Sequence, residues 1–529
     1  MKQLTLKNRK RLLSTRLLWA SILNTFIFNA YLLNFAIEHL NLEDIHGYIT
    51  LVTLVLVMFA FTFFILTLLA CISICLTKLV VFIATELNLI ALYYMLQYRV
   101  VLDKSMMGNI FNTSIEEASS YLSFEIVIGL VALSALLAFI MINVKVEKAD
   151  RLFSLAISSF VFLIALFIAY VNSSSWLWFD EHGKQLGARV LPWSYIVNGT
   201  RYIQLVAKRN VKPIQLPLGT FKDQEKQVVV LVIGETARAA NFSQYGYHRT
   251  TTPELLKLGT YALPQTESCT TYTTGSLSCL LSHQGESTFS KAFYEPLPTY
   301  LHRQGVDVIW RTNNWGEPPL SVTSYENASE LKAACKGGDC AYDGVLLTGL
   351  SERIKQSQAA KIFIVLHLKG SHGPNYSDRY PERYERFKPA CRSVELSKCS
   401  YQSLINAYDN TLLYTDSVIA STIKTVQTLK MKSSLLYISD HGESLGEEGL
   451  YLHGTPKTLA PSVQYQVPFL IWTSPEFLNY HNAPEGFRHN SNPYSQSNIF
   501  HSVLGAFKLQ SPVYQIDLDI FADPNPSLR

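Results

Sequence analysis

Five long apolar stretches in the first 171 residues constrain the fold of this chain more than any other feature. They cover residues 17–36, 49–72, 76–96, 122–144 and 153–171. A helix needs about 20 apolar residues to cross a bilayer, and each stretch is close to or above that length. We therefore predict a transmembrane domain of five helices over residues 1–172.

Basic side chains flank these stretches and predict how the domain is oriented. Six precede the first stretch and three lie between the fourth and the fifth: Lys2, Lys7, Arg9, Lys10, Arg11, Arg16, Lys145, Lys148 and Arg151. Because basic loops stay in the cytoplasm, we expect a cytoplasmic N-terminus and, after five spans, a remainder on the far side. The net charge of +4 is small and gathers at these flanks, so we expect no nucleic acid partner.

Six cysteines beyond these stretches form close pairs in sequence: Cys269 with Cys279, Cys335 with Cys340, and Cys391 with Cys399. Short loops favour pairing between neighbours, and the far side of the membrane is an oxidising compartment. A zinc site is the alternative for these thiols, but no CxxC motif occurs among them. We predict three local disulfides.

The rest of the chain changes character twice. Residues 173–225 contain Trp176, Trp178, Trp193 and Tyr195, which indicate an interfacial linker at the membrane surface, with ordinary surface loops as the alternative. From residue 226 to 529, buried β-branched runs alternate with helical patterns; the runs are residues 227–233, 307–310, 361–366 and 434–438. This alternation predicts an α/β sandwich with a mostly parallel sheet.

Carboxylate and imidazole side chains follow several of these strands. They are Glu235, His367, His372, Asp440 and His441, with His453 twelve residues later. A single such residue is usually solvated or structural, but the carboxyl ends of parallel strands meet at one edge of the sheet. Oxygen and nitrogen ligands without thiolate suit catalytic zinc. The sequence therefore predicts a zinc site at this edge.

A hydroxyl-rich segment, residues 270–278, lies between Cys269 and Cys279. A threonine hydroxyl barely ionises at neutral pH and needs a metal or a base to become a nucleophile. The segment is thus either a source of a nucleophile next to the zinc site or a polar surface loop held by a disulfide.

Four motifs resemble those of the bacterial phosphoethanolamine transferases of the cell envelope, which include the lipid A-modifying and mobile colistin-resistance enzymes. The motifs are VLVIGETAR followed by FSQYGY, SCTTYTTGSLSC, HLKGSHGPNYSDRYP and SDHGESLGEEGLYLHGTP. The resemblance covers essentially the whole chain. It implies an alkaline phosphatase/sulfatase-like catalytic domain in the periplasm, attached to five helices in the bacterial inner membrane.

The resemblance also implies roles for individual residues. Glu235, Asp440 and His441 match the zinc ligands, and Thr273 matches the nucleophile that also touches the metal. His372 and His453 match positions that contact the donor phosphate or a second zinc ion, and His367 lies near them. Residues of the loop between the third and fourth spans match a donor-binding segment and recur at a spacing of four, which places them on one helical face: Asn109, Thr113 and Glu117.

The activity that the resemblance implies is transfer of phosphoethanolamine from phosphatidylethanolamine, through a phosphothreonine, to lipid A or core sugars of lipopolysaccharide. We expect a monomer embedded in membrane lipids, with at least one zinc ion. Glycerophosphate transfer or phosphodiester hydrolysis by the same fold is the alternative, and a non-enzymatic membrane sensor is a second. One departure leaves the acceptor open: residues 315–319 read WGEPP, where lipid A-type relatives have a substrate-contacting lysine near Pro318.

Overall fold

The computed structural model describes residues 12–113, 124–142, 148–172, 174–209, 212–289, 293–337, 339–483 and 493–522. The chain divides into two compact units. One comprises Met1–Met107 and Leu122–Ile203, and the other comprises Gly108–Tyr121 and Gln204–Arg529. We describe each unit by itself.

The first unit is helical. Among the described residues, three helices are long and apolar enough to cross a membrane: α4 (Ile45–Ile72), α5 (Ile74–Tyr98) and α9 (Lys148–Val171). A fourth candidate is bent by 55° at Asn29, between α3 (Ala30–His39) and the π-helix η1 (Asn24–Phe28) that continues α2 (Leu12–Leu23). Helix α8 (Phe124–Ile142) has a shorter apolar part, Ile126–Leu136. The count of five spans therefore stays a prediction.

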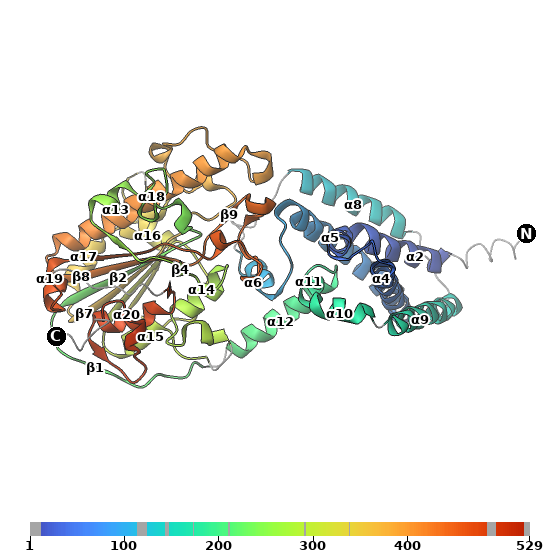
Figure 1. Ribbon diagram of the computed structural model, residues 1–529, viewed down its shortest axis with the longest axis horizontal. Coiled ribbons are helices and arrows are strands. Elements are labelled where there is room, and N and C mark those ends of the chain that lie inside the picture. Colours follow the sequence, from blue (N-terminus) through green and yellow to red (C-terminus); the bar gives the residue numbers. More distant parts are fainter. Residues whose placement is uncertain are drawn as a thin grey trace, which may run out of the picture. The chain divides into compact units, whose positions relative to one another are not determined.

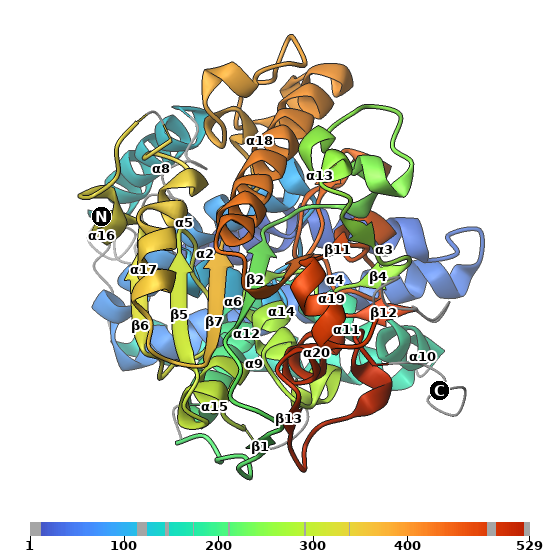
Figure 2. The same cartoon turned by 90° about the vertical axis from the view of Figure 1, so that its left-hand side faces the viewer.

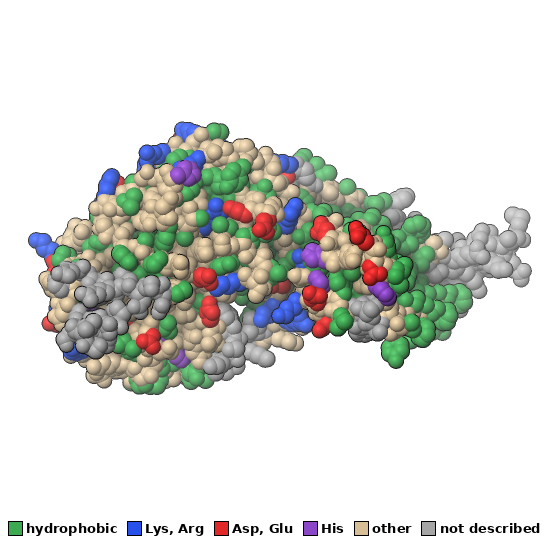
Figure 3. All heavy atoms as spheres, viewed as in Figure 1, with side chains coloured by type: hydrophobic (Ala, Val, Ile, Leu, Met, Phe, Trp, Pro, Cys, Tyr) green, Lys and Arg blue, Asp and Glu red, His purple; other side chains and the backbone are tan. Residues whose placement is uncertain are grey.

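Helix α9 has large apolar side chains on its exposed face and small polar ones on its buried face. Phe153, Phe160 and Phe167, spaced two turns apart, are exposed by 65–67% of their surface, and Figure 3 shows such hydrophobic side chains gathered over this unit. On the opposite face Ser158 is fully buried and hydrogen-bonds to Thr67 of α4. Small polar residues between helices and large apolar ones outside are typical of helices packed in lipid.

The aromatic segment after α9 forms three helices, α10 (Ser174–Glu181), α11 (Gly183–Gly187) and α12 (Trp193–Arg209), of which α12 belongs to this unit up to Ile203. The side chain of Asn29, at the break after η1, accepts a hydrogen bond from Leu191 N–H at 2.8 Å and donates to Leu191 O at 2.9 Å. The break after the π-helix thus places a buried polar side chain where it fixes the chain just before α12.

The second unit is built on a seven-stranded sheet within the described residues, with the order β3-β11-β8-β2-β7-β5-β6. The strands are β3 (Tyr261–Ala262), β11 (Phe469–Thr473), β8 (Lys432–Ser439), β2 (Gln227–Gly234), β7 (Lys361–His367), β5 (Asp307–Thr312) and β6 (Ser324–Asn327). The five strands from β8 to β6 are parallel, and β11 runs antiparallel to both of its neighbours. The predicted mostly parallel sheet is confirmed.

Helices cover both faces of this sheet because its central strands are buried on both sides; all eight residues of β2 are buried. Figures 1 and 2 show α13 (Pro253–Lys257) and α18 (Tyr401–Thr428) on one face, and α15 (Leu297–Arg303) and α20 (Asn498–Ala506) on the other. The remaining α-helices and strands of the described residues are α6 (Lys104–Asn112), α14 (Thr273–Leu280), α16 (Ala328–Lys332), α17 (Leu350–Gln356), α19 (Pro475–Tyr480), β1 (Thr220–Phe221), β4 (Thr266–Glu267), β9 (Ser444–Leu445), β10 (Tyr451–Leu452), β12 (Tyr494–Ser495) and β13 (Leu509–Gln510).

The register of the sheet decides which side chains meet at its edge. Ile233 in β2 pairs with His367 in β7 and with Ile438 in β8, and Gly234 pairs with Ser439. The loops that follow these three strands therefore start side by side, at the carboxyl edge where parallel sheets place their functional residues.

Candidate active site

Glu235 leaves the sheet through a strained turn directly after β2. The next residue, Thr236, has φ = 52°, which is unusual for a β-branched residue. Its N–H donates to Asp440 Oδ1 at 3.1 Å, and its carbonyl accepts a hydrogen bond from Tyr408 at 2.7 Å. Two side chains from other elements thus hold the turn that presents Glu235.

His441 lies between the two carboxylates. Its Nε2 atom is 3.2 Å from Glu235 Oε1 and 3.3 Å from Asp440 Oδ2, and all three side chains are completely buried. Its Nδ1 atom is 2.9 Å from the carbonyl oxygen of Gly442. Because a carbonyl can only accept, Nδ1 carries a hydrogen, and Nε2 faces two carboxylate oxygens, so that a proton or a cation must lie between them.

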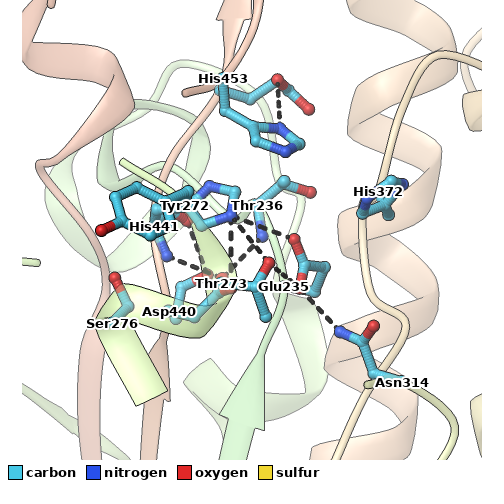
Figure 4. A network of polar contacts seen from close by, with 12 residues as sticks. Glu235, Thr236, Tyr272, Thr273, Ser276, Asn314, His372, Asp440, His441 and His453 are labelled. Atoms are coloured by element: carbon cyan, nitrogen blue, oxygen red, sulfur yellow. Dashed lines mark hydrogen bonds and ion pairs between the residues drawn. The ribbon is translucent and has the colours of Figure 1, made fainter. Parts of the chain in front are cut away.

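Thr273 occupies the same cluster. Its hydroxyl donates to Glu235 Oε2 at 3.3 Å and lies 3.4 Å from His441 Nε2 (Figure 4). Thr273 is the first residue of α14, so a phosphate on its side chain would sit at a helix N-terminus. The Cys269–Cys279 disulfide joins the start of the segment to α14.

His453 reaches this cluster through a hairpin. Strands β9 and β10 pair so that Ser444 faces Leu452, which places Glu443 and His453 opposite each other just beyond the pair. Glu443 Oε1 is 3.2 Å from His453 Nδ1. The His453 ring centroid is 4.3 Å from that of His441, and Glu235, His441 and His453 each offer one ligand atom within 4.8 Å of the others.

The other histidines lie further out. The His372 ring is 5.5 Å from the His453 ring, and its Nδ1 is 2.8 Å from the carbonyl oxygen of Gly373 (Figure 4). His367, the last residue of β7, is fully buried with Nδ1 3.3 Å from Thr312 Oγ1. It is not among the residues that could share one metal ion in the described part of the chain.

The predicted donor-binding residues lie only partly within the described residues. Thr113 hydrogen-bonds through both its N–H and its hydroxyl to the carbonyl of Asn109, so these two residues are one helical turn apart, as predicted. Glu117 lies outside the described residues.

The cluster fits a divalent cation. Glu235 Oε1 and Asp440 Oδ2 are buried and accept no hydrogen bond from any described residue. Without a metal, burial and the neighbouring Glu235 raise the pKa of Asp440 well above its usual value. Burial lowers the pKa of His441, but Asp440 and Glu235 outweigh it and raise that pKa to about 10. The site thus needs positive charge, and its oxygen and nitrogen donors match the ligands of catalytic zinc.

The six paired cysteines form three disulfides in the structure, Cys269–Cys279, Cys335–Cys340 and Cys391–Cys399. These are the pairs that their spacing predicts.

Asn314 contacts the cluster, although the sequence assigned it no role. Its Nδ2 donates to Glu235 Oε2 at 2.7 Å and to Leu368 O at 3.0 Å, which leaves Glu235 Oε1 for a cation. The signal that could have found it is its position two residues after β5, at the same edge of the sheet. Glu443 was likewise overlooked, although it lies within the motif that contains Asp440 and His441.

Comparisons with known proteins agree with this architecture. A sulfatase family model matches residues 227–509, and a model for the phosphoethanolamine transferases EptA/EptB matches residues 58–206. The chain is 40% identical to the phosphoethanolamine transferase EptA of Helicobacter pylori, over 82% of this chain and 83% of that protein. It is 31% identical to EptA of Salmonella typhimurium, over 97% of both chains.

A solved structure is similar over nearly the whole length. The integral membrane lipooligosaccharide phosphoethanolamine transferase A of Neisseria meningitidis matches with a TM-score of 0.82 and 28% identity, covering 95% of this chain and 97% of that one. The resemblance drawn from the four motifs is therefore confirmed, and the chain belongs to the phosphoethanolamine transferase family.

Proposed function

We propose that this chain is a zinc-dependent enzyme that transfers phosphoethanolamine from phosphatidylethanolamine to lipid A or core sugars of lipopolysaccharide. A phosphothreonine at Thr273 is the intermediate. The observation that supports this most directly is the position of the Thr273 hydroxyl, 3.3 Å from Glu235 Oε2 and 3.4 Å from His441 Nε2. The similar proteins named above are phosphoethanolamine transferases, and one of them acts on lipooligosaccharide by its name.

Glu235, Asp440, His441 and Thr273 would hold the zinc ion. When bound, zinc supplies positive charge that lowers the pKa of the threonine hydroxyl and offsets the charge on the phosphoryl oxygens. Asn314 holds Glu235 Oε2, and the Gly442 carbonyl holds His441 Nδ1, so both ligands are oriented before substrate arrives.

Thr273 Oγ1 then attacks the phosphorus of the lipid headgroup. A bond forms between Oγ1 and phosphorus, and the bond from phosphorus to the diacylglycerol oxygen breaks. The hydroxyl hydrogen points to Glu235 Oε2, which leaves a lone pair of Oγ1 for the phosphorus. The proton that Oγ1 gives up ends on the departing oxygen, so diacylglycerol leaves as the alcohol. An acceptor oxygen later displaces the threonine. Positioning and charge dominate such phosphoryl transfers.

His453 and His372 complete the site in this proposal. Because His453 Nδ1 contacts Glu443, its Nε2 atom is the ring nitrogen that would serve as a ligand of a second zinc ion or as a partner of the donor phosphate. His372, whose ring is 5.5 Å from that of His453, and His367, at the end of β7, are further partners of donor or acceptor in this proposal.

The acceptor side of the site is the loop after β5. A Cβ atom on Gly316 would lie 3.4 Å from the Thr273 methyl group, so this loop packs directly against the nucleophile. Glu317 follows, with a side chain only 12% exposed and a hydrogen bond from Tyr325. An acidic side chain stands here instead of the nearby lysine of lipid A-type relatives, so we place the choice of acceptor in this loop.

The proposal also assigns places to the domains. Residues 1–172 anchor the chain in the bacterial inner membrane with a cytoplasmic N-terminus, and residues 173–225 lie at the outer surface of that membrane. Residues 226–529 form the periplasmic catalytic domain, near the donor headgroups that the segment with Asn109, Thr113 and Glu117 binds. The monomeric state and the number of zinc ions belong to the same proposal.

The test is the mass of the enzyme itself. Incubated with phosphatidylethanolamine and no acceptor, the full chain should gain the mass of one phosphoethanolamine on Thr273. Thr273→Ala should gain none, and Thr274→Ala, which removes the adjacent hydroxyl, should be modified like the unsubstituted protein. A glycerophosphate adduct, or modification of Thr273→Ala, would contradict the proposal.

A further inference from the structure

We propose that Gln496 is a positioning residue for the reaction proposed above, on which this inference rests. Its buried side-chain amide fixes the segment that carries Thr273 against the strand end that carries Asp440. Gln496 lies in none of the four motifs and is more than 200 residues from Cys269 in sequence.

The contacts of Gln496 use its amide fully. Its Oε1 atom accepts a hydrogen bond from Cys269 N–H at 2.9 Å. Its Nε2 atom donates to the carbonyl of Ser439 at 3.0 Å and to that of Asp440 at 2.6 Å. The side chain is 0% exposed, so water cannot replace any of these bonds.

The backbone brings Gln496 to this place. Strand β12 pairs in parallel with β4, with Ser495 beside Glu267, and Gln496 N–H donates to Glu267 O at 3.3 Å. Gln496 therefore lies beside Glu267, just before the segment that contains Cys269 and Thr273 begins. From this position its side-chain amide reaches Ser439, the last residue of β8.

The hydrogen bonds of Gln496 connect the segment that carries Thr273 to a part of the fold that the contacts described next do not reach. The Cys269–Cys279 disulfide joins the start of the segment to α14, so it links the segment only to itself. The Thr271 hydroxyl donates to Thr455 O at 2.6 Å, and Gly454 N–H donates to Thr271 O at 2.8 Å, which ties the segment to the side of His453. Gln496 ties it to the Asp440 backbone, and so sets the distance from the Thr273 hydroxyl to the carboxylate side of the metal site.

Loss of the Gln496 amide should slow the attack of Thr273 without weakening the binding of the lipid donor. Gln496 is buried and touches no space open to substrate, so its loss should leave the donor concentration for half-maximal reaction unchanged. A displacement of a nucleophile by about 1 Å can cost about a hundredfold in rate. We expect the maximal rate constant of adduct formation to fall at least tenfold.

Two substitutions separate the contribution of the amide oxygen, which accepts a hydrogen bond, from that of the amide nitrogen, which donates two. Gln496→Met keeps the length of the side chain and removes all three hydrogen bonds. Gln496→Glu keeps the acceptor for Cys269 N–H and replaces the donor with an oxygen that faces two carbonyls. The matched controls are Gln510→Met and Gln510→Glu, because Gln510 in β13 is exposed.

The experiment follows single-turnover formation of the phosphoethanolamine adduct by intact mass, using the full chain in detergent with excess lipid donor. The rate constant reports positioning, whereas the amplitude reports the fraction of folded protein. Bound zinc is measured by elemental analysis on the same samples. The proposal expects slow rate constants with near-normal amplitude and zinc in both Gln496 variants, and normal values in the Gln510 controls.

A Gln496→Met rate constant within twofold of the unsubstituted protein, or a loss confined to amplitude, would overturn this inference and leave the proposed function standing. If Gln496→Met does not accumulate, the rate constant of Gln496→Glu decides by the same criterion. Absence of any adduct on the unsubstituted protein would instead overturn the proposed function.

Discussion

Nε2 of His441 lies 3.2 Å from Oε1 of Glu235, and both side chains are completely buried. With Nδ1 of His441 facing the Gly442 carbonyl, this contact places a lone pair against a carboxylate oxygen. Such a pair is stable in a buried site only if a proton or a metal ion lies between them.

Replacing Glu235 should therefore release zinc. Glu235→Gln keeps the shape but removes the negative charge, and we expect zinc affinity to fall by more than about tenfold, since even residues behind metal ligands change affinity by about ten- to hundredfold. Elemental analysis after dialysis against graded chelator measures it. Glu267→Gln is the control, because Glu267 is 43% exposed and pairs with Lys457; equal zinc retention in both variants would contradict the assignment.

Glu443 should affect the rate of adduct formation by orienting the ring of His453. Glu443→Gln weakens the contact that orients the His453 ring, which is 3.2 Å in the structure, so we expect adduct formation to slow by about ten- to hundredfold. Single-turnover kinetics with lipid donor provide the measurement. Glu448→Gln changes an exposed neighbour in the same segment and should leave the rate unchanged. Equal rates in the two variants would show that His453 needs no such support.

The sequence predicted the centre of the sheet better than its edges. The buried run that became β2 is continuous and β-branched, and such a run has few alternatives to a central parallel strand. The edge strand β6 escaped prediction because its residues, Ser324–Asn327, are polar and only partly buried. The sequence also missed the bend in the first apolar run, since residues 17–36 read as one straight helix whereas the helix breaks at Asn29, after η1.

The site was predictable where strand ends determine it. Glu235, Asp440 and His441 follow two neighbouring strands, so the rule for parallel sheets brings them together. His453 is brought to the site by the short β9–β10 hairpin. Gln496 is brought there by the pairing of β12 with β4. Two-residue strands of this kind leave no periodic pattern in a sequence, and long-range hydrogen bonds from an amide leave none either.

Asp343 should stabilise the loops on the other side of Glu235. Its carboxylate accepts hydrogen bonds from Asn313 Nδ2 and Lys369 N–H, both at 2.8 Å, and from Gly370 N–H at 2.9 Å. Asp343→Asn turns an amide group toward one of these donors, and we expect a loss of about 1–3 kcal/mol, because buried donors are left unpaired. Thermal unfolding of the full chain in detergent measures it.

The control for Asp343 comes from the same loop. Asp339 pairs with Arg383 at the surface and is 36% exposed, so Asp339→Asn should change the midpoint of unfolding little. A similar shift in both variants would mean that the Asp343 contacts contribute no more than a surface ion pair.

His501 should make the catalytic unit sensitive to acid. The hydrogen bonds of the His501 ring require its neutral form. Nε2 lies 3.1 Å from the carbonyl oxygen of His283, and Nδ1 accepts a hydrogen bond from Gln515 N–H at 3.1 Å, so Nδ1 carries no hydrogen. Burial lowers the pKa of His501 to about 4 in the folded protein. Between about pH 6.5, where an unfolded histidine titrates, and pH 4, only the unfolded chain binds the proton.

Stability should therefore fall as the pH drops through this window, by about 1.4 kcal/mol per pH unit from this one group. His501→Asn carries an amide that does not titrate, so its unfolding midpoint should change less steeply between pH 6.5 and 4 than that of the unsubstituted protein. His248→Asn, at an exposed position, should keep the steep dependence. Parallel pH profiles for the unsubstituted protein and His501→Asn would show that the ring is already protonated in the fold, at the expense of the Gln515 hydrogen bond.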